Sequence, residues 1–165
     1  MTEARLAEIL AAERAQTVVH LAFLASPSHA SAWAHELESV GTMHVLNACR
    51  ERPVRKFVLW SQTVLYGASP SNPNFLTEAH PLRGQSPYSA TKIAADKMCE
   101  AFALSFETPV VTLRPFNTYG PRQSSRAVIP TVLSQLLAGA ERLRLGALSP
   151  RRDFTFVTDT CDGFV

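Results

Sequence analysis

Apolar residues gather in short continuous runs at three places along the chain, and each run predicts a strand. The runs are rich in β-branched residues, a pattern typical of strands buried on both faces of a parallel sheet. They occupy residues 17–23, 56–61 and 110–115. Two shorter stretches, 142–146 and 154–157, are expected to form further strands.

Between these runs, longer segments carry apolar residues at helical spacing. Such spacing gives a helix one apolar face that packs on a core. The expected helices are 2–15, 36–51, 87–106 and 127–138, and a loop rich in Pro, Ser and Asn is expected over 66–86. In the long helix 87–106, the expected apolar side is formed by Ile93, Ala94, Met98, Ala101 and Phe102.

Strands and helices therefore alternate along the chain. This order predicts an α/β fold, a Rossmann-like parallel sheet with helices on both faces. No internal repeat, low-complexity tract or linker interrupts the 165 residues, so residues 1–165 are expected to form one domain.

The composition narrows the classes of partner. The chain is 46% hydrophobic and 18% charged, with a formal net charge of +2, which is typical of globular domains and lacks the basic excess of nucleic-acid or anionic-membrane binders. No apolar run approaches the roughly 20 residues of a membrane helix. We therefore expect a cytoplasmic protein with neither a nucleic acid nor a membrane as partner.

The three cysteines, Cys49, Cys99 and Cys161, are far apart and form no CxxC pair. This spacing suggests neither a zinc site nor a disulfide framework. We expect buried reduced thiols and no metal site. His20 lies within an apolar strand run with no second ligand near it in sequence, which favours a hydrogen-bonded core histidine.

The segment SPYSATKIAAD, residues 86–96, holds Tyr88 and Lys92 one helical turn apart. Free tyrosine has a pKa of about 10, and a neighbouring ammonium favours the phenolate, so such a pair can take a proton from a substrate hydroxyl. Alone this spacing is a weak signal, because polar pairs on one helix face are common. Its context is stronger: LWSQTVLYG and LRPFNTYGPRQ follow the ends of two expected strands, where ligands bind in open α/β sheets.

With these segments together, the chain resembles the extended short-chain dehydrogenase/reductases, the NAD-dependent sugar-nucleotide epimerases and dehydratases. The resemblance covers essentially the whole chain. It rests on VVHLAFLASP, VGTMHVLNACRE, SPYSATKIAADKM, LRPFNTYGPRQ, RAVIPTVLSQLLAG and RRDFTFVTDTCDGF. NTYGPRQSSRAVIPT and SPRRDFTFV are most similar to the UDP-N-acetylglucosamine 4,6-dehydratases of the legionaminic-acid type.

The resemblance implies a role for individual residues. Tyr88 is the base that takes the sugar hydroxyl proton, and Lys92 holds the nicotinamide ribose and lowers the pKa of Tyr88. Gln62 stands where the family carries a catalytic Ser or Thr. The implied NAD-lining residues are Ala22, Phe23, Ser61, Tyr88, Lys92 and Pro115, and the implied substrate-binding residues are Asn117, Val128 and Arg152.

Three of these implied ligand-binding residues also have a simpler structural explanation. Asn117 also suits a turn, Pro115 also suits a strand end, and Arg152 also suits a solvated loop. The resemblance further implies a homodimer through the YxxxK helix. The candidate interface residues Met98, Cys99, Phe102 and Phe106 suit a core equally well, and their helical spacing favours the core.

The chain departs from the family at its ends. The family begins with a GxxGxxG turn that binds the dinucleotide pyrophosphate, and none of the seven glycines here forms one. We expect the first βαβ units, about 60 residues at about 30 per unit, to be missing, so that the strand at 17–23 becomes a sheet edge. The expected domain is thus a partial NAD-binding domain, with the start of the substrate-binding segment near 120–165.

The chain also departs from the family at the site. Gln62 is longer than a Ser or Thr and cannot relay a proton as a hydroxyl does. Thr63 and Val64 stand where dehydratases carry an acid pair or a Glu, which an epimerase does not need. Glu38 replaces an Asn that is frequent in the family and is expected to disturb the packing of the strand-end loop.

These observations predict a protein of the NAD-dependent epimerase/dehydratase type. It would act on a UDP-sugar by Tyr–Lys-assisted hydride transfer at C4, with NAD as cofactor. The alternative is a catalytically inactive fragment or pseudoenzyme of the family, which Gln62 and Val64 favour. A nucleotide-binding regulatory module is a third reading.

Overall fold

A computed structural model describes residues 3–23, 32–67 and 76–165. The chain divides into two compact units, Met1–Arg114 and Pro115–Val165, and each is described by itself. The first unit holds the larger sheet and the Tyr–Lys helix, so it positions the candidate site.

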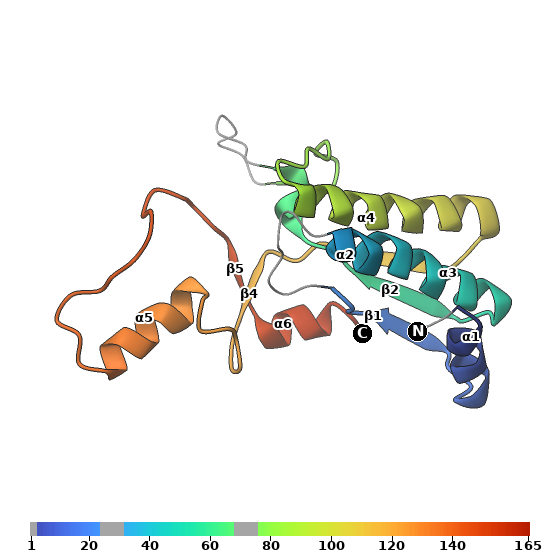
Figure 1. Ribbon diagram of the computed structural model, residues 1–165, viewed down its shortest axis with the longest axis horizontal. Coiled ribbons are helices and arrows are strands. Elements are labelled where there is room, and N and C mark those ends of the chain that lie inside the picture. The colour runs from blue at the N-terminus through green and yellow to red at the C-terminus, as the bar shows by residue number, and fades with distance from the viewer. Residues whose placement is uncertain (1–2, 24–31, 68–75) are drawn as a thin grey trace. The chain divides into compact units, whose positions relative to one another are not determined.

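Three parallel strands form the sheet of the first unit. They are β1 (Thr17–His20), β2 (Lys56–Trp60) and β3 (Val110–Leu113), in the order β1-β2-β3 (Figure 1). Phe57 lies opposite Val18 on one side and Val110 on the other. The predicted parallel α/β sheet is confirmed, and the strand from the 17–23 run is an edge strand among the described residues.

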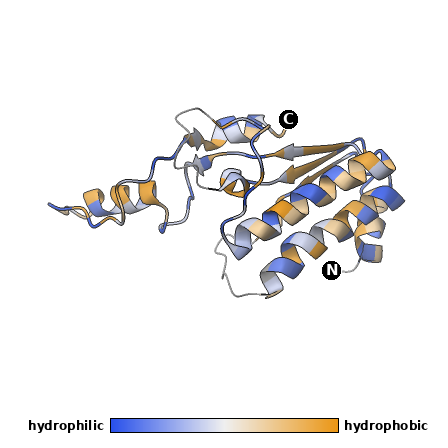
Figure 2. Ribbon diagram, turned by 90° about the horizontal axis from the view of Figure 1, so that it is seen from above, coloured by the Kyte–Doolittle hydropathy of each residue, from blue (hydrophilic) through white to orange (hydrophobic). Residues whose placement is uncertain are grey.

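Helices connect these strands and pack on one another. They are α1 (Glu3–Ala12), α2 (Ala32–His35), the π-helix η1 (Glu36–Val40), α3 (Gly41–Glu51), the 3₁₀ helix η2 (Thr63–Tyr66) and α4 (Pro87–Phe106). Figures 1 and 2 show α1, α3 and α4 on the same face of the sheet. The core between them is formed by Leu46, Cys49, Val54, Phe57, Leu59, Ala95, Cys99 and Phe102.

Burial on both faces was predicted for all three strands and holds only for β2. Its Phe57, Val58 and Leu59 are all buried. On the outer strands, Val19 is 43% exposed and Val111 is 44% exposed. In the part of the first unit that the structure describes, β1 and β3 therefore each expose apolar side chains that β2 does not.

Helix α4 has the bounds that the sequence predicts. Ser86 accepts a hydrogen bond from the backbone N–H of Ser89, whose side chain in turn accepts from the Ser86 backbone N–H. This capping box, with Pro87 in the first turn, satisfies N–H groups that a helix start leaves unpaired. The helix ends at Glu107, which takes the left-handed conformation with φ 54°.

The face that α4 buries differs in part from the predicted one. Phe102 is buried as expected, but Ala101 is exposed, and Ala95 and Cys99 complete the apolar contact. The helix also buries Ser89, Thr91, Lys92 and Asp96. The buried face of α4 therefore contains polar as well as apolar side chains, and it is turned about the helix axis relative to the apolar face that the sequence predicts.

The helix expected over 36–51 begins earlier, at Ala32, and contains a π-helical turn at Glu36–Val40. A π-turn widens the helix by one residue and has no signature in the apolar spacing. It brings Glu38 and Ser39 into the interior, where both are buried.

The second unit holds a small parallel sheet and two helices. Strand β4 (Asn117–Tyr119) pairs with β5 (Phe154–Phe156), and the helices are α5 (Val128–Leu137) and α6 (Val157–Asp162). The strand predicted at 142–146 was wrong: these residues are exposed irregular chain. Gln135 instead exchanges two hydrogen bonds with the backbone of Arg144.

Two smaller expectations are resolved by the fold. Cys49 and Cys99 are buried as predicted, whereas Cys161 on the short helix α6 is exposed. Among the described residues, no helix combines the length and the apolar character that crossing a membrane requires.

Candidate active site

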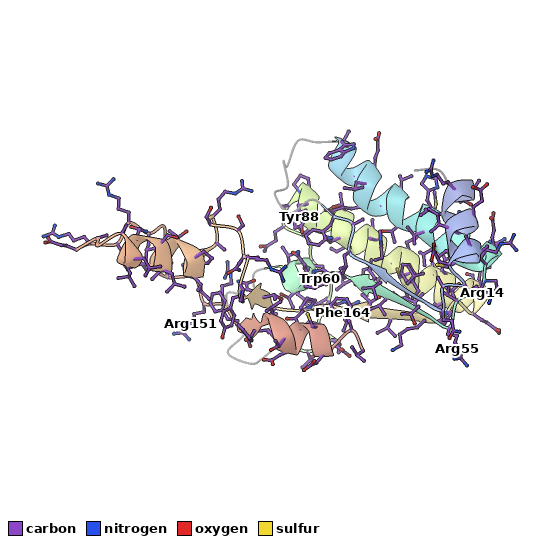
Figure 3. All side chains as sticks on the ribbon, turned by 90° about the horizontal axis from the view of Figure 1, so that it is seen from below. Arg14, Arg55, Trp60, Tyr88, Arg151 and Phe164 are labelled. Carbon is purple, nitrogen blue, oxygen red and sulfur yellow. The ribbon has the colours of Figure 1, made fainter. Side chains whose placement is uncertain are left out.

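The candidate site lies where β1 and β2 end and α4 begins. Tyr88 is in the first turn of α4, and Figure 3 labels it together with Trp60, the last residue of β2. Lys92 follows one turn later and is only 4% exposed. The carboxyl ends of parallel strands and the start of a helix are the expected location of a ligand site in this fold.

Three groups surround the Lys92 ammonium. Its Nζ lies 4.3 Å from the centre of the Phe23 ring and 5.8 Å from the centre of the Tyr88 ring. The Glu38 Oε2 lies 3.9 Å away. Burial lowers the pKa of Lys92, and the Glu38 charge opposes that shift. The pair Tyr88–Lys92 is thus one cluster, as the sequence predicts, with Phe23 at its side.

The pKa of Tyr88 moves in the direction opposite to the one expected. Burial and, to a smaller extent, the Glu38 charge raise this pKa, a hydrogen bond with Gln62 lowers it, and together they bring it to about 12. The net shift is therefore upward, whereas the sequence led us to expect a lowered pKa. Desolvation of the phenolate and the adjacent Glu38 carboxylate, which both disfavour the charged form, determine this direction.

Gln62 and Ser61 follow directly after β2. Because the Gln62 hydrogen bond lowers the pKa of Tyr88, Gln62 stabilises the phenolate form, as an amide N–H donor does. Ser61 is 1% exposed, and its hydroxyl has no hydrogen-bond partner in the described part of the chain. Ala22 follows β1, is exposed, and precedes Phe23, which stacks on Trp60 with ring centres 6.3 Å apart.

His20 is the core histidine that the sequence predicts. It is 8% exposed, and its Nε2 lies 3.0 Å from the Thr42 hydroxyl. That hydroxyl donates to the Glu38 carbonyl, so the His20 ring must donate through Nε2–H. Burial, followed by the Lys92 charge, lowers the pKa of His20 from 6.5 to about 4. His20 is therefore neutral at neutral pH.

Sequence reasoning missed a second charged cluster on α4. Arg114, directly after β3, donates from Nε and Nη2 to the Asp96 carboxylate at 2.9 and 2.6 Å, and from Nη1 to the Tyr66 hydroxyl at 2.9 Å. Asp96 is 2% exposed. This bidentate pair fixes the end of β3 and the helix η2 against α4. Asp96 stands four residues after Lys92, and that spacing is the one signal the sequence offers.

Glu38 was singled out in the sequence for an effect on the strand-end loop, most of which lies outside the described residues. Glu38 itself lies in η1, is 2% exposed, and accepts a hydrogen bond from the Thr91 hydroxyl at 2.8 Å. Its spacing of four and eight residues from Thr42 and Leu46, both buried, marks the inner face of that helix.

The remaining predicted site residues belong to the second unit. Pro115 is half-buried, and Asn117, Val128 and Arg152 are exposed. The Asn117 backbone N–H donates to the Asp153 carbonyl at 3.3 Å, so Asn117 and Arg152 lie at the same end of the β4–β5 sheet. Arg152 donates to the Arg151 carbonyl at 2.8 Å. Their contacts with cofactor or substrate stay predictions.

A parallel α/β sheet with a polar cluster at the carboxyl ends of its strands is typical of Rossmann-like domains, which bind their ligands there. The sequence model of the NAD dependent epimerase/dehydratase family matches residues 1–165, and the chain belongs to this family.

Individual relatives agree with this family. The chain is 33% identical over 159 residues to an uncharacterized UDP-glucose epimerase, YtcB, of Bacillus subtilis (strain 168), covering 92% of this chain and 48% of that protein.

Solved structures are similar as well. The UDP-N-acetylglucosamine 4-epimerase of Methanobrevibacter ruminantium M1, solved with UDP-N-acetylmuramic acid, has a TM-score of 0.84 at 29% identity, covering 96% of this chain and 52% of the other. The dTDP-glucose 4,6-dehydratase of Bacillus anthracis, solved with NAD, has a TM-score of 0.85 at 29% identity, covering 97% and 49%. The chain spans about half the length of the curated relatives it matches.

The family is NAD-dependent, and the residues present fit the nicotinamide-ribose part of that cofactor. A buried cation, a phenol and the unpartnered Ser61 hydroxyl gather at the strand ends, and these groups can bind ribose hydroxyls and an amide. Phe23 covers one side of the Lys92 ammonium and restricts access to it.

We expect Arg114→Met to lower the free energy of unfolding by about 3 kcal/mol, because it leaves the buried Asp96 carboxylate without its cation. Urea unfolding measures this. The matched control is Lys97→Met, which removes the cation from an exposed ion pair with Glu100 and should cost less than about 1 kcal/mol. Equal losses in the two variants would contradict the structural role of Arg114.

We expect His20 to make folding sensitive to acid. Its pKa in the folded protein is lowered to about 4, so its neutral form stabilises the fold above pH 6.5, and this stability is lost as pH falls from 6.5 to 4. At 1.36 kcal/mol per pKa unit, the full loss is about 3 kcal/mol. We expect the free energy of unfolding, measured with urea at a series of pH values, to depend less steeply on pH over this window in His20→Gln than in the wild type. Identical slopes would refute a lowered pKa.

Proposed function

We propose that this chain carries the hydride-transfer half of an NAD-dependent enzyme that oxidises and reduces C4 of a UDP-sugar. The observation that supports it best is the cluster of Tyr88, Lys92 and Gln62 at the carboxyl ends of β1 and β2. Because the chain spans about half of its relatives' length, the complete activity is proposed for the protein to which this site belongs.

The proposed role of Tyr88 is proton transfer with the C4 hydroxyl of the sugar. NAD supplies the hydride acceptor and donor at C4. Gln62 donates a hydrogen bond to the Tyr88 oxygen and so stabilises the phenolate that forms when Tyr88 gives up its proton. Lys92 binds ribose hydroxyls through its ammonium, which Glu38 keeps charged despite burial.

Between the two reactions of the family, the site favours epimerisation. Dehydration needs a group that removes the C5 proton and assists departure of water at C6. Thr63 and Val64 occupy η2 at the corresponding place, and neither side chain is an acid or a base at neutral pH. Epimerisation needs only reversible hydride transfer and rotation of the keto-sugar. The legionaminic-type dehydratase suggested by sequence remains a prediction.

A non-catalytic family member is the second candidate. Two observations favour it: the pKa of Tyr88 is about 12, and the Phe23 ring covers the Lys92 ammonium. Such a protein would retain the fold and the polar cluster while turning over no substrate.

Isothermal titration of the chain with NAD, followed by an assay with UDP-glucose and UDP-N-acetylglucosamine, tests the catalytic proposal. We expect NAD binding and turnover, with Tyr88→Phe reducing kcat by about 10²- to 10⁴-fold, because it removes the proton-transferring hydroxyl. Tyr119→Phe, in the aromatic cluster of the second unit, is the matched control and should retain activity. Binding without turnover would favour the non-catalytic candidate, and absence of NAD binding would overturn the catalytic proposal for this chain.

Phe23→Ala tests whether the aromatic ring restricts the cofactor site. We expect it to tighten NAD binding, because it uncovers the ammonium of Lys92. Trp33→Ala is the control, since Trp33 is 60% exposed and lies in α2. Weaker binding by Phe23→Ala alone would show instead that Phe23 contributes to the cofactor site, as the family resemblance implies.

A further inference from the structure

Glu38 is a buried acid that the proposed chemistry does not use. It lies in the π-helical turn η1, which packs against α4, and its side chain is 1% exposed. A carboxylate removed from water costs free energy unless a cation and hydrogen bonds compensate it. Single π-turns inside helices are frequent at functional sites.

The compensation comes from two successive residues of α4. The Thr91 hydroxyl donates to Glu38 Oε2 at 2.8 Å, and the Lys92 Nζ lies 3.9 Å from the same oxygen. Ser39, the next residue of the π-turn, donates to the Thr91 carbonyl at 3.4 Å. The π-turn therefore fixes the segment of α4 that carries Lys92 through backbone and side-chain contacts together.

We propose that Glu38 is a positioning residue of the Tyr88–Lys92 pair. Its carboxylate holds the Lys92 ammonium beside Tyr88 and neutralises much of the positive charge that Tyr88 would otherwise experience. The inference rests on the proposed function only in giving Tyr88 the proton-transfer role; the charge coupling itself belongs to the folded chain.

The groups that face this pair leave Glu38 as its dominant anion. His20 on β1 is neutral at neutral pH, because burial lowers its pKa to about 4. Asp96, one turn further along α4, is bound by Arg114. His35 of α2 hydrogen-bonds Ser39, and Gln62 contributes a neutral amide.

Glu38 raises the pKa of both members of the pair, which favours the charged form of Lys92 and the neutral form of Tyr88. It raises the pKa of Lys92 against the effect of burial, which keeps the ammonium charged. It also raises the pKa of Tyr88, which keeps the phenol protonated. Replacement by a neutral amide of the same shape should therefore lower both pKa values.

The test is a pH titration of the full chain by NMR of ¹⁵N-labelled lysine side chains. The chain has only three lysines, Lys56, Lys92 and Lys97, so Lys92→Arg assigns the signal of interest. In Glu38→Gln we expect Lys92 to lose its proton at a lower pH than in the wild type. A lysine that titrates at the same or a higher pH would overturn the proposal.

Glu100→Gln is the matched control. It removes the carboxylate from the exposed pair with Lys97 on the same helix and should leave the Lys92 titration unchanged. Tyrosinate absorbance, taken as the difference between each protein and its Tyr88→Phe version, should show Tyr88 ionising at a lower pH in Glu38→Gln. A merely structural Glu38 would change the unfolding midpoint and move neither titration.

A double variant decides the case in which Glu38→Gln does not fold. Glu38→Gln with Lys92→Met removes both charges, so we expect it to fold and to melt above either single variant that folds. A double variant that melts no higher than the single ones, or stays unfolded, would overturn the coupling. The lysine titration, the tyrosinate titration and the melting measurement all proceed without NAD or substrate. Failure of the proposed function would therefore leave the coupling between Glu38 and the Tyr88–Lys92 pair intact.

Discussion

The ammonium of Lys92 is buried on the inner face of α4, and much of the site depends on how its charge is compensated. In an interior of low dielectric constant, an isolated cation would lose its proton or unfold the site. The protein supplies a carboxylate, Glu38, and the face of an aromatic ring, Phe23. Both residues lie in the connection between β1 and β2, so the compensation of one charge ties this connection to helix α4 at two points.

The same helix repeats this solution one turn later with the charges reversed. Asp96 is the buried anion there, and Arg114 reaches it from the end of β3 with a bidentate contact. Helix α4 thus carries a cation and an anion on its inner face, four residues apart, each paired with a different element. The apolar contacts of α4 come from Ala95, Cys99 and Phe102, so they begin beside Asp96 and continue toward the end of the helix. The first turns of α4 hold the site, and the later turns stabilise the core.

Helices and strands that are specified by residues near them in the sequence were predicted correctly. Helix α4 was predicted with its observed bounds because Ser86 and Pro87 specify its start, and β2 because its apolar run is buried on both faces. The exposure of Val19 and Val111 was not predictable, since it depends on which face of the sheet helices cover. A run at 142–146 with strand-like composition found no pairing partner. The strand expected at 154–157 is β5, but its partner β4 was not predicted, because the pairing joins residues 37 positions apart and leaves little trace in local composition.

The site shows the same division between local and non-local information. The Tyr88–Lys92 pair is local, and its spacing together with the neighbouring strand-end segments and the family resemblance singled it out; the resemblance also placed Gln62 beside it. The partners Glu38 and Arg114 stand 54 and 18 residues from the side chains they bind, and no periodicity links such positions. Sequence reasoning therefore identified the pair for which we propose proton transfer, and it did not identify the charged partners of Lys92 and Asp96. The direction of the Tyr88 pKa was wrong for this reason, because it depends on burial and on Glu38.

Two departures from the family pattern act on Tyr88 with opposite sign. Gln62 stabilises the phenolate by hydrogen bonding, whereas Glu38 destabilises it by its charge. Their balance, added to the cost of burial, leaves the phenol protonated at neutral pH. In the proposed chemistry, a protonated phenol is the form that gives a proton to a carbonyl oxygen as hydride returns to C4. In that chemistry, the protein alone would favour the reductive half of the reaction. The oxidative half would need a further group that lowers the pKa of Tyr88, and the positive charge of bound NAD would supply one.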